Sequence, residues 1–158
     1  AKETDEFGNR PTTFLETAGT SIRSALELFK KHGCVKDALL PLSGGLSTLS
    51  ESAFFLKAQE YKILTDFANI DVDAGVWQRW LAKEGPIAAR LLVDHTFMNA
   101  SAEKPTLEEY IPFGDPQSMP HAVAIVGYTD RDEFIIRNSW GTDKWGDKGF
   151  AYATFDYM

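Results

Sequence analysis

Two neighbouring stretches decide the expected fold: residues 120–128, PHAVAIVGY, and residues 134–141, FIIRNSWG. Each contains an apolar run, and the TDRDE segment between them, residues 129–133, is polar and turn-like. Two short apolar runs separated by such a segment are typical of an antiparallel hairpin. The position halfway between His121 and Asn138 falls at this turn, so a hairpin would bring the two side chains close together.

The residues at this end of the hairpin suggest a chemical role. An imidazole oriented by an amide oxygen, with an indole nearby to exclude water, is half of a nucleophilic catalytic site. His121, Asn138 and Trp140 provide these three groups. The alternative is a structural histidine at a strand start that bonds to an asparagine. A catalytic interpretation also requires a nucleophile.

The composition limits the class of protein. A chain of 158 residues with 44% hydrophobic and 13% aromatic residues is long enough for a globular core, in one domain or two small lobes. The formal charge of −7 comes without a stripe of Lys and Arg, which argues against a nucleic-acid partner. No apolar run approaches the roughly 20 residues of a membrane span, so no membrane partner is expected.

Hydrophobic periodicity predicts the remaining elements. Helices are expected at residues 21–32, 49–59 and 74–83. Further strands are expected at residues 61–64, 87–93 and 150–154. Thr48 and Glu51 would form a capping box for the second helix, and Asp73 would cap the third. Residues 94–119 are expected to be rich in loops. Helices in the first half and antiparallel strands in the second predict an α+β fold.

Several motifs together resemble the C-terminal half of papain-like cysteine peptidases. They are HAV at residues 121–123, VGY at residues 126–128, RNSWG at residues 137–141, WGDKGF at residues 145–150 and GPI at residues 85–87. The resemblance implies a papain-like architecture with a catalytic cleft between two lobes. Residues 1–60 would be a partial helical left lobe, and residues 61–158 an antiparallel, barrel-like right lobe.

The resemblance also implies roles for single residues. His121 would be the general base and acid, Asn138 would orient its ring, and Trp140 would shield that contact. Gly19 would lie on the cleft edge, where its bare backbone can pair with an extended substrate.

Three further positions would contact substrate. By the resemblance, Met119 and Ala122 would line the pocket for the side chain two residues before the cleaved bond. Arg90 occupies a position where relatives often carry a small residue in that pocket, so it would favour acidic or polar side chains. The alternative for Arg90 is an arginine on a solvated strand face.

The nucleophile is the part of the pattern that is not found. In the family it precedes the histidine by roughly 130–150 residues, which places it about 10–30 residues before Ala1. The Cys-Gly-x-Cys-Trp pattern of the family does not occur in the sequence. Cys34, the one cysteine, lies too close to His121 for this spacing and follows the negative end of a predicted helix. It is expected to be a small buried apolar residue.

The sequence therefore predicts peptide-bond hydrolysis by the C-terminal part of a papain-like peptidase, without a cofactor or metal. Its partners would be a peptide or protein substrate and a second chain, an N-terminal segment or a homodimer mate that completes the site. Two alternatives stay open. One is an inactive papain-like fold that binds peptides or regulates a partner, and the other is a Cys-His-Asn transpeptidase or amide transferase.

Overall fold

The computed structural model describes residues 6–7, 10–11, 20–40, 47, 49–62, 66–114 and 120–158. The chain divides into two compact units, Ala1–Asn69 and Ile70–Met158. Each unit is described by itself. The expected division into lobes at residues 60 and 61, and the cleft between them, stay predictions.

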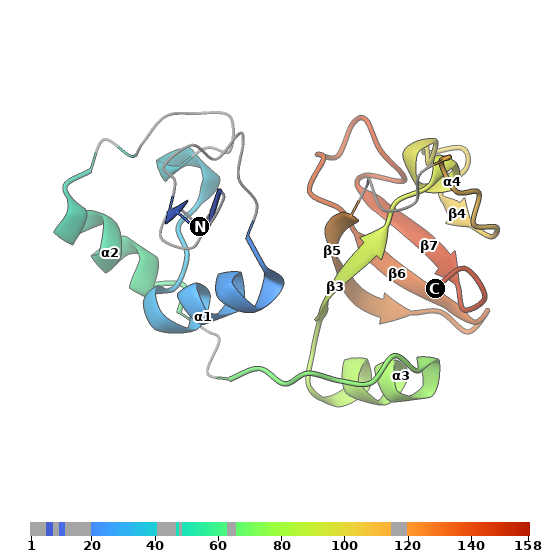
Figure 1. Cartoon of the computed structure of the whole chain (residues 1–158), viewed down its shortest axis with the longest axis horizontal. Coiled ribbons are helices and arrows are strands. Elements are labelled where there is room, and N and C mark those ends of the chain that lie inside the picture. Colours follow the sequence, from blue (N-terminus) through green and yellow to red (C-terminus); the bar gives the residue numbers. More distant parts are fainter. Residues whose placement is uncertain are drawn as a thin grey trace. The chain divides into compact units, whose positions relative to one another are not determined.

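The first unit is mainly helical. Its elements are β1 (Glu6–Phe7), β2 (Arg10–Pro11), α1 (Ile22–His32), a short 3-10 helix (Asp37–Leu39) and α2 (Glu51–Gln59) (Figure 1). Strands β1 and β2 pair antiparallel.

Helix α1 confirms the predicted helix at residues 21–32 to within one residue. Ser21 caps its start by accepting a hydrogen bond from the Ser24 N–H. Gly33 ends it with φ of 81°, and its N–H donates to the Phe29 carbonyl. A Cβ at this position would collide with the Ala58 carbonyl of α2, so only glycine allows this approach of the two helices.

Two predictions in the first unit need correction. Helix α2 begins at Glu51 rather than at residue 49, and Ser50 is its cap because its hydroxyl accepts from the Ala53 N–H. Thr48 lies outside the described residues. Residues 61–62 are not a strand, because their N–H groups donate back to the carbonyls of residues 58 and 59 and the chain is still turning there. The rest of that predicted strand, residues 63–64, lies outside the described part.

The second unit contains a five-stranded sheet. Its elements are α3 (Ala74–Lys83), β3 (Ile87–Leu92), α4 (His95–Met98), β4 (Thr106–Leu107), β5 (Pro120–Tyr128), β6 (Glu133–Arg137) and β7 (Phe150–Thr154). The strand order is β3-β5-β6-β7-β4, in which only the β4–β7 pair is parallel. Helix α3 precedes β3 and α4 follows it, so the two helices lie toward opposite ends of this strand (Figure 1).

Most predictions for the second unit are confirmed. Helix α3 and strand β7 match their predicted limits, and Asp73 caps α3 by accepting from the Val76 N–H. The predicted hairpin is β5–β6, with a bulge between Ile125 and Gly127. The stretch expected to be loop contains α4 and β4, which at four and two residues are too short to produce a periodic pattern.

The core lies on one face of this sheet. Alternate positions of β5 are buried there, so that Ile125 joins the cluster around Trp77 of α3 and Val123 joins the cluster around Phe97 of α4. The second unit therefore has two apolar clusters, and the partly buried Ala89 and Met158 pack against both of them. No described helix has the length and apolarity that a membrane crossing requires.

Candidate active site

The side chains of His121 and Asn138 are in contact. His121 is the second residue of β5, Asn138 follows the last residue of β6, and the His121 Nε2 to Asn138 Oδ1 distance is 2.8 Å. The hairpin brings the two residues together as the sequence predicts. Asn138 is 2% exposed, and His121 is half-buried.

A second hydrogen bond determines which nitrogen of His121 carries the proton. The Ser139 N–H donates to the same Asn138 Oδ1 at 2.7 Å. Because a backbone N–H can only donate, the Asn138 atom that faces it is the oxygen, and His121 Nε2 must donate to that oxygen as well. In the neutral imidazole, the lone pair is then on Nδ1.

Hydrogen bonds at Gly149 and from Arg137 hold the loop that follows Asn138. The Asn138 N–H donates to the Gly149 carbonyl at 3.0 Å, and Arg137 Nη1 donates to the Lys148 carbonyl at 3.0 Å. The Arg137 guanidinium also lies 4.7 Å from the centre of the Phe150 ring. Gly149 has φ of 83°, and a Cβ there would collide with Arg137 Nη1. The loop is therefore held at the base of the strand that presents Asn138.

Aromatic rings surround the imidazole. The Trp140 ring centre lies 4.7 Å from that of His121, and the indole is 38% exposed. Below it, the fully buried ring of Phe97 meets His121 edge-on at 5.8 Å and Trp140 edge-on at 5.6 Å. Trp145 packs on Phe97 at 4.7 Å, and its indole N–H donates to the Phe97 carbonyl. The His121–Asn138 contact thus has an apolar wall.

Phe97 is a site residue that the sequence interpretation missed. It belongs to α4, which is held beside His121 because Leu91, near the end of β3, pairs with His121 in the β3–β5 register. The available signal was local, since Asp94 precedes Phe97 at the spacing of a helix cap. Within the described residues, no group of three or more His, Cys, Asp or Glu side chains could hold a metal ion.

Arg90 and Ala122 are neighbours across two strands. The β3–β5 register pairs them directly, one position along each strand from the Leu91–His121 pair. Both side chains are exposed, and Arg90 takes part in none of the ion pairs between described residues. Gly19 and Met119 lie outside the described residues, so their roles stay predictions.

Cys34 corrects an expectation. It is exposed rather than buried. It follows Gly33, after the end of α1, and therefore does not belong to the helix face that packs toward α2.

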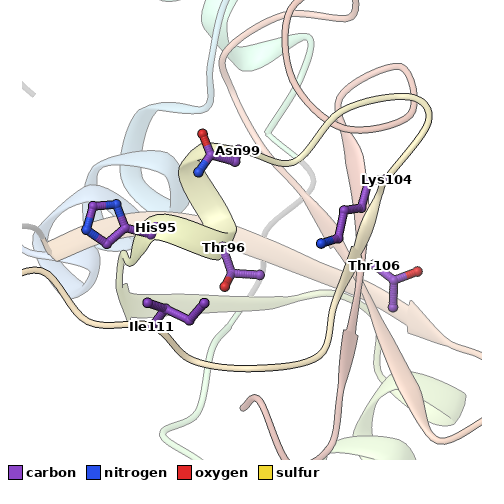
Figure 2. A pocket seen from close by; sticks show the side chains of 6 residues that line it. All are labelled: His95, Thr96, Asn99, Lys104, Thr106 and Ile111. Carbon is purple, nitrogen blue, oxygen red and sulfur yellow. The ribbon is translucent and has the colours of Figure 1, made fainter.

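A separate small pocket lies on the flank of α4 (Figure 2). Its volume is about 130 Å³, and it is lined by His95, Thr96, Asn99, Lys104, Thr106 and Ile111. None of the predicted site residues lines it. The pocket is therefore distinct from the His121–Asn138 site.

The comparisons with known proteins identify the family. The family described as "Papain family cysteine protease" matches residues 11–156, which include the whole hairpin. The chain belongs to the papain family of cysteine proteases. This confirms the resemblance found in the motifs. A sequence search of curated proteins gave no match.

Solved structures of the papain family support the same fold. Xylellain, a cysteine protease from Xylella fastidiosa, is 23% identical with a TM-score of 0.65, over 88% of this chain and 56% of that one. Digestive procathepsin L 3 of the Tenebrio molitor larval midgut is 18% identical with a TM-score of 0.59, over 85% and 43%. The α+β, papain-like fold class is confirmed. The chain spans 56% or less of the length of these two structures.

Proposed function

We propose that this chain is the C-terminal part of a papain-family cysteine peptidase that hydrolyses peptide bonds. His121 is its general base and acid, and Asn138 orients the ring. The observation that carries the proposal is the double hydrogen bond to Asn138 Oδ1, from His121 Nε2 and from Ser139 N. It keeps the proton on Nε2 and leaves Nδ1 to exchange a proton with a nucleophile.

Trp140 supports this role by shielding the His121–Asn138 bond from water. A hydrogen bond is stronger in surroundings of low dielectric constant, and the Trp140 indole lies against the imidazole as well as against the rings of Phe97 and Trp145. A rigid imidazole can then serve in two successive proton transfers without changing tautomer.

The nucleophile in this proposal is a cysteine on a segment upstream of Ala1 or on a second chain. The sequence lacks the cysteine pattern of the family, and the chain spans only part of the compared structures. In the first unit, Ala58 is the only buried residue among those described, while Leu26, Phe29 and Phe54 stay half-exposed. A further segment would cover such apolar side chains.

Asn138 supplies a second reason to expect such a segment. Its Nδ2 is buried and has no hydrogen-bond partner in the described part of the chain. A buried donor without an acceptor costs about 1–3 kcal/mol. A carbonyl on the completing segment would satisfy it.

The reaction then follows in two stages. The thiolate attacks the peptide carbonyl carbon, the C–N bond breaks, and the imidazolium of His121 gives its proton to the leaving amine. Water next attacks the thioester carbon while His121 takes a proton from the water. The C–S bond then breaks and releases the acid and the thiol. These steps require no cofactor.

Substrate contacts complete the proposal. Gly19 would pair with the substrate backbone at the cleft edge, and Met119, Ala122 and Arg90 would form the pocket for the residue two before the cleaved bond. Support comes from the direct pairing of Arg90 with Ala122 beside His121. The lobes at residues 1–60 and 61–158 would flank the cleft.

A binding or regulatory module without activity is the second candidate. It is favoured by one observation, which is that the sequence contains a single cysteine outside the family's pattern. Both candidates use the same His121–Asn138 site and differ in whether a nucleophile completes it.

Two preparations separate these candidates. One is the 158-residue chain, and the other is a longer product of the same gene with an upstream cysteine. Each is treated with a fluorogenic peptide and then with a thiol-directed epoxide, and the labelled residue is located by mass spectrometry. We expect the longer product to be active and labelled upstream, and its Asn138→Ala variant to lose about 100-fold in kcat. Cleavage by the 158-residue chain with the label on Cys34 would contradict the proposal, and inactivity of both would favour the binding module.

A further inference from the structure

Asp94 is a fully buried carboxylate in the second unit. Its Oδ1 accepts from the Phe97 N–H at 2.8 Å and from the Tyr157 hydroxyl at 2.6 Å. Its Oδ2 accepts from the Ile111 N–H at 2.6 Å. One side chain therefore joins the end of β3, helix α4, the segment around Ile111 and the turn after β7.

These contacts explain why the residue is an aspartate. Both of its oxygens face donors, whereas an asparagine would turn an NH₂ group toward a backbone N–H and leave two donors opposed. Burial acts to raise the pKa of Asp94, but the hydrogen bonds from Tyr157, Phe97 and Ile111 together outweigh it and hold the pKa below its ordinary value. The charged form is thus the one that this cage of donors fits.

The element that Asp94 holds carries the wall of the candidate site. Asp94 is the N-cap of α4, and Phe97 is the third residue of that four-residue helix. Because so short a helix has little stability of its own, the position of the Phe97 ring depends on the cap. That ring contacts both His121 and Trp140, and the Phe97 carbonyl accepts the Trp145 indole N–H.

We propose that Asp94 and Tyr157 are positioning residues for His121. The Tyr157 hydroxyl holds the Asp94 carboxylate, the carboxylate holds the first turn of α4, and α4 holds Phe97 against the imidazole and the Trp140 indole. When these contacts are loosened, the imidazole can move away from Asn138 Oδ1. The positioning role of Asp94 and Tyr157 rests on the proposed function of His121.

The chain offers a matched comparison for the cap. Asp73 caps α3 with the same geometry, because its Oδ1 accepts from the Val76 N–H at 2.8 Å. Helix α3 packs its Trp77 into the other core cluster, around Ile125 and Phe134. Asp73→Ala therefore removes a cap in the same unit, at a cost of about 0.5–2 kcal/mol, without touching the wall of the site. Tyr128→Phe, at an exposed tyrosine, is the corresponding control for Tyr157→Phe.

The test is heteronuclear NMR of the 158-residue chain. It measures the fraction of the His121 Nε2–H tautomer and the hydrogen-exchange rates of that proton and of the Trp145 indole proton. We expect Tyr157→Phe and Asp94→Asn to raise both exchange rates about tenfold, as loss of a hydrogen bond to a charged group would. We also expect them to mix the tautomers, with both controls at wild-type values.

Two results would overturn the proposal. One is a His121 tautomer fraction and hydrogen-exchange rates in Tyr157→Phe that equal those of the wild type. This variant removes only one hydroxyl, so it keeps the fold even if Asp94→Asn does not. The other is an equal change in Asp73→Ala at the same loss of stability, which would make the effect one of general destabilisation. Neither readout needs a nucleophile or activity, so failure of this proposal is distinguishable from failure of the proposed peptidase function.

Discussion

Arg90 is the residue on which the proposed substrate selectivity depends. Arg90 is exposed, has no ion-pair partner among the described residues, and pairs with Ala122 across the β3–β5 register. A cation without an ion-pair partner attracts a carboxylate at short range, although the net charge of the chain is −7. This is the basis for an acidic preference in the proposed pocket.

Arg90→Ala should therefore change selectivity in the active enzyme. We compare substrates that carry Glu or Leu two residues before the cleaved bond. The kcat/KM for Glu divided by that for Leu should fall by about threefold to fivefold, because exposed ion pairs contribute at most about 1 kcal/mol. Arg79→Ala, an exposed arginine on α3, is the control. An unchanged ratio in Arg90→Ala would show instead that Arg90 is a solvated residue of a strand face.

At the scale of elements, the cap of α4 should make stability depend on acid. The pKa of Asp94 is lowered in the folded state, so its contribution to the free energy of unfolding is complete above the unfolded pKa of about 3.9 and is lost as the pH falls through the folded pKa. Urea unfolding at stepped pH should find Asp94→Asn less stable near neutrality but less sensitive to acid. Tyr157→Phe should lie between it and the wild type, and parallel pH curves for all three would contradict this.

The loop after β6 depends on backbone conformation at Gly149. Its φ of 83° and the collision of a Cβ with the backbone oxygen of Gly141, as well as with Arg137 Nη1, oppose any other residue. We expect Gly149→Ala to lower the free energy of unfolding by about 1–3 kcal/mol in urea titrations. Gly114→Ala, where a Cβ meets nothing within 4 Å, should change it by less than about 0.5 kcal/mol. Equal effects of the two substitutions would refute this account of the loop.

At the scale of the whole molecule, the two units differ in how much they bury. The second unit has two linked core clusters, whereas Ala58 is the only buried residue among those described in the first. Hydrogen exchange should therefore be fast for amides of α1 and α2 and slow for those of β5 and β6, and sedimentation should show association that covers the apolar residues of the first unit. A strictly monomeric chain with equal protection in both units would contradict this.

Much of the second unit could be predicted because its signals are local. Asp73 marks the start of α3, alternating residues mark β7, and the turn between β5 and β6 lies halfway between His121 and Asn138. The predictions of a buried Cys34 and of a strand at residues 61–62 were wrong, because each depends on where the chain goes after a helix ends.

The sequence by itself determined that His121 and Asn138 meet, since they are 17 residues apart across one turn and the period of a strand allows little error. Only the tertiary structure decided that Phe97 lies under the imidazole and that Tyr157 holds Asp94, a partner 63 residues away. Contacts between distant segments depend on how strands stack side by side, and α4 is too short to leave a pattern of its own. The base of the candidate site is thus a property of one hairpin, and its support is a property of the folded unit.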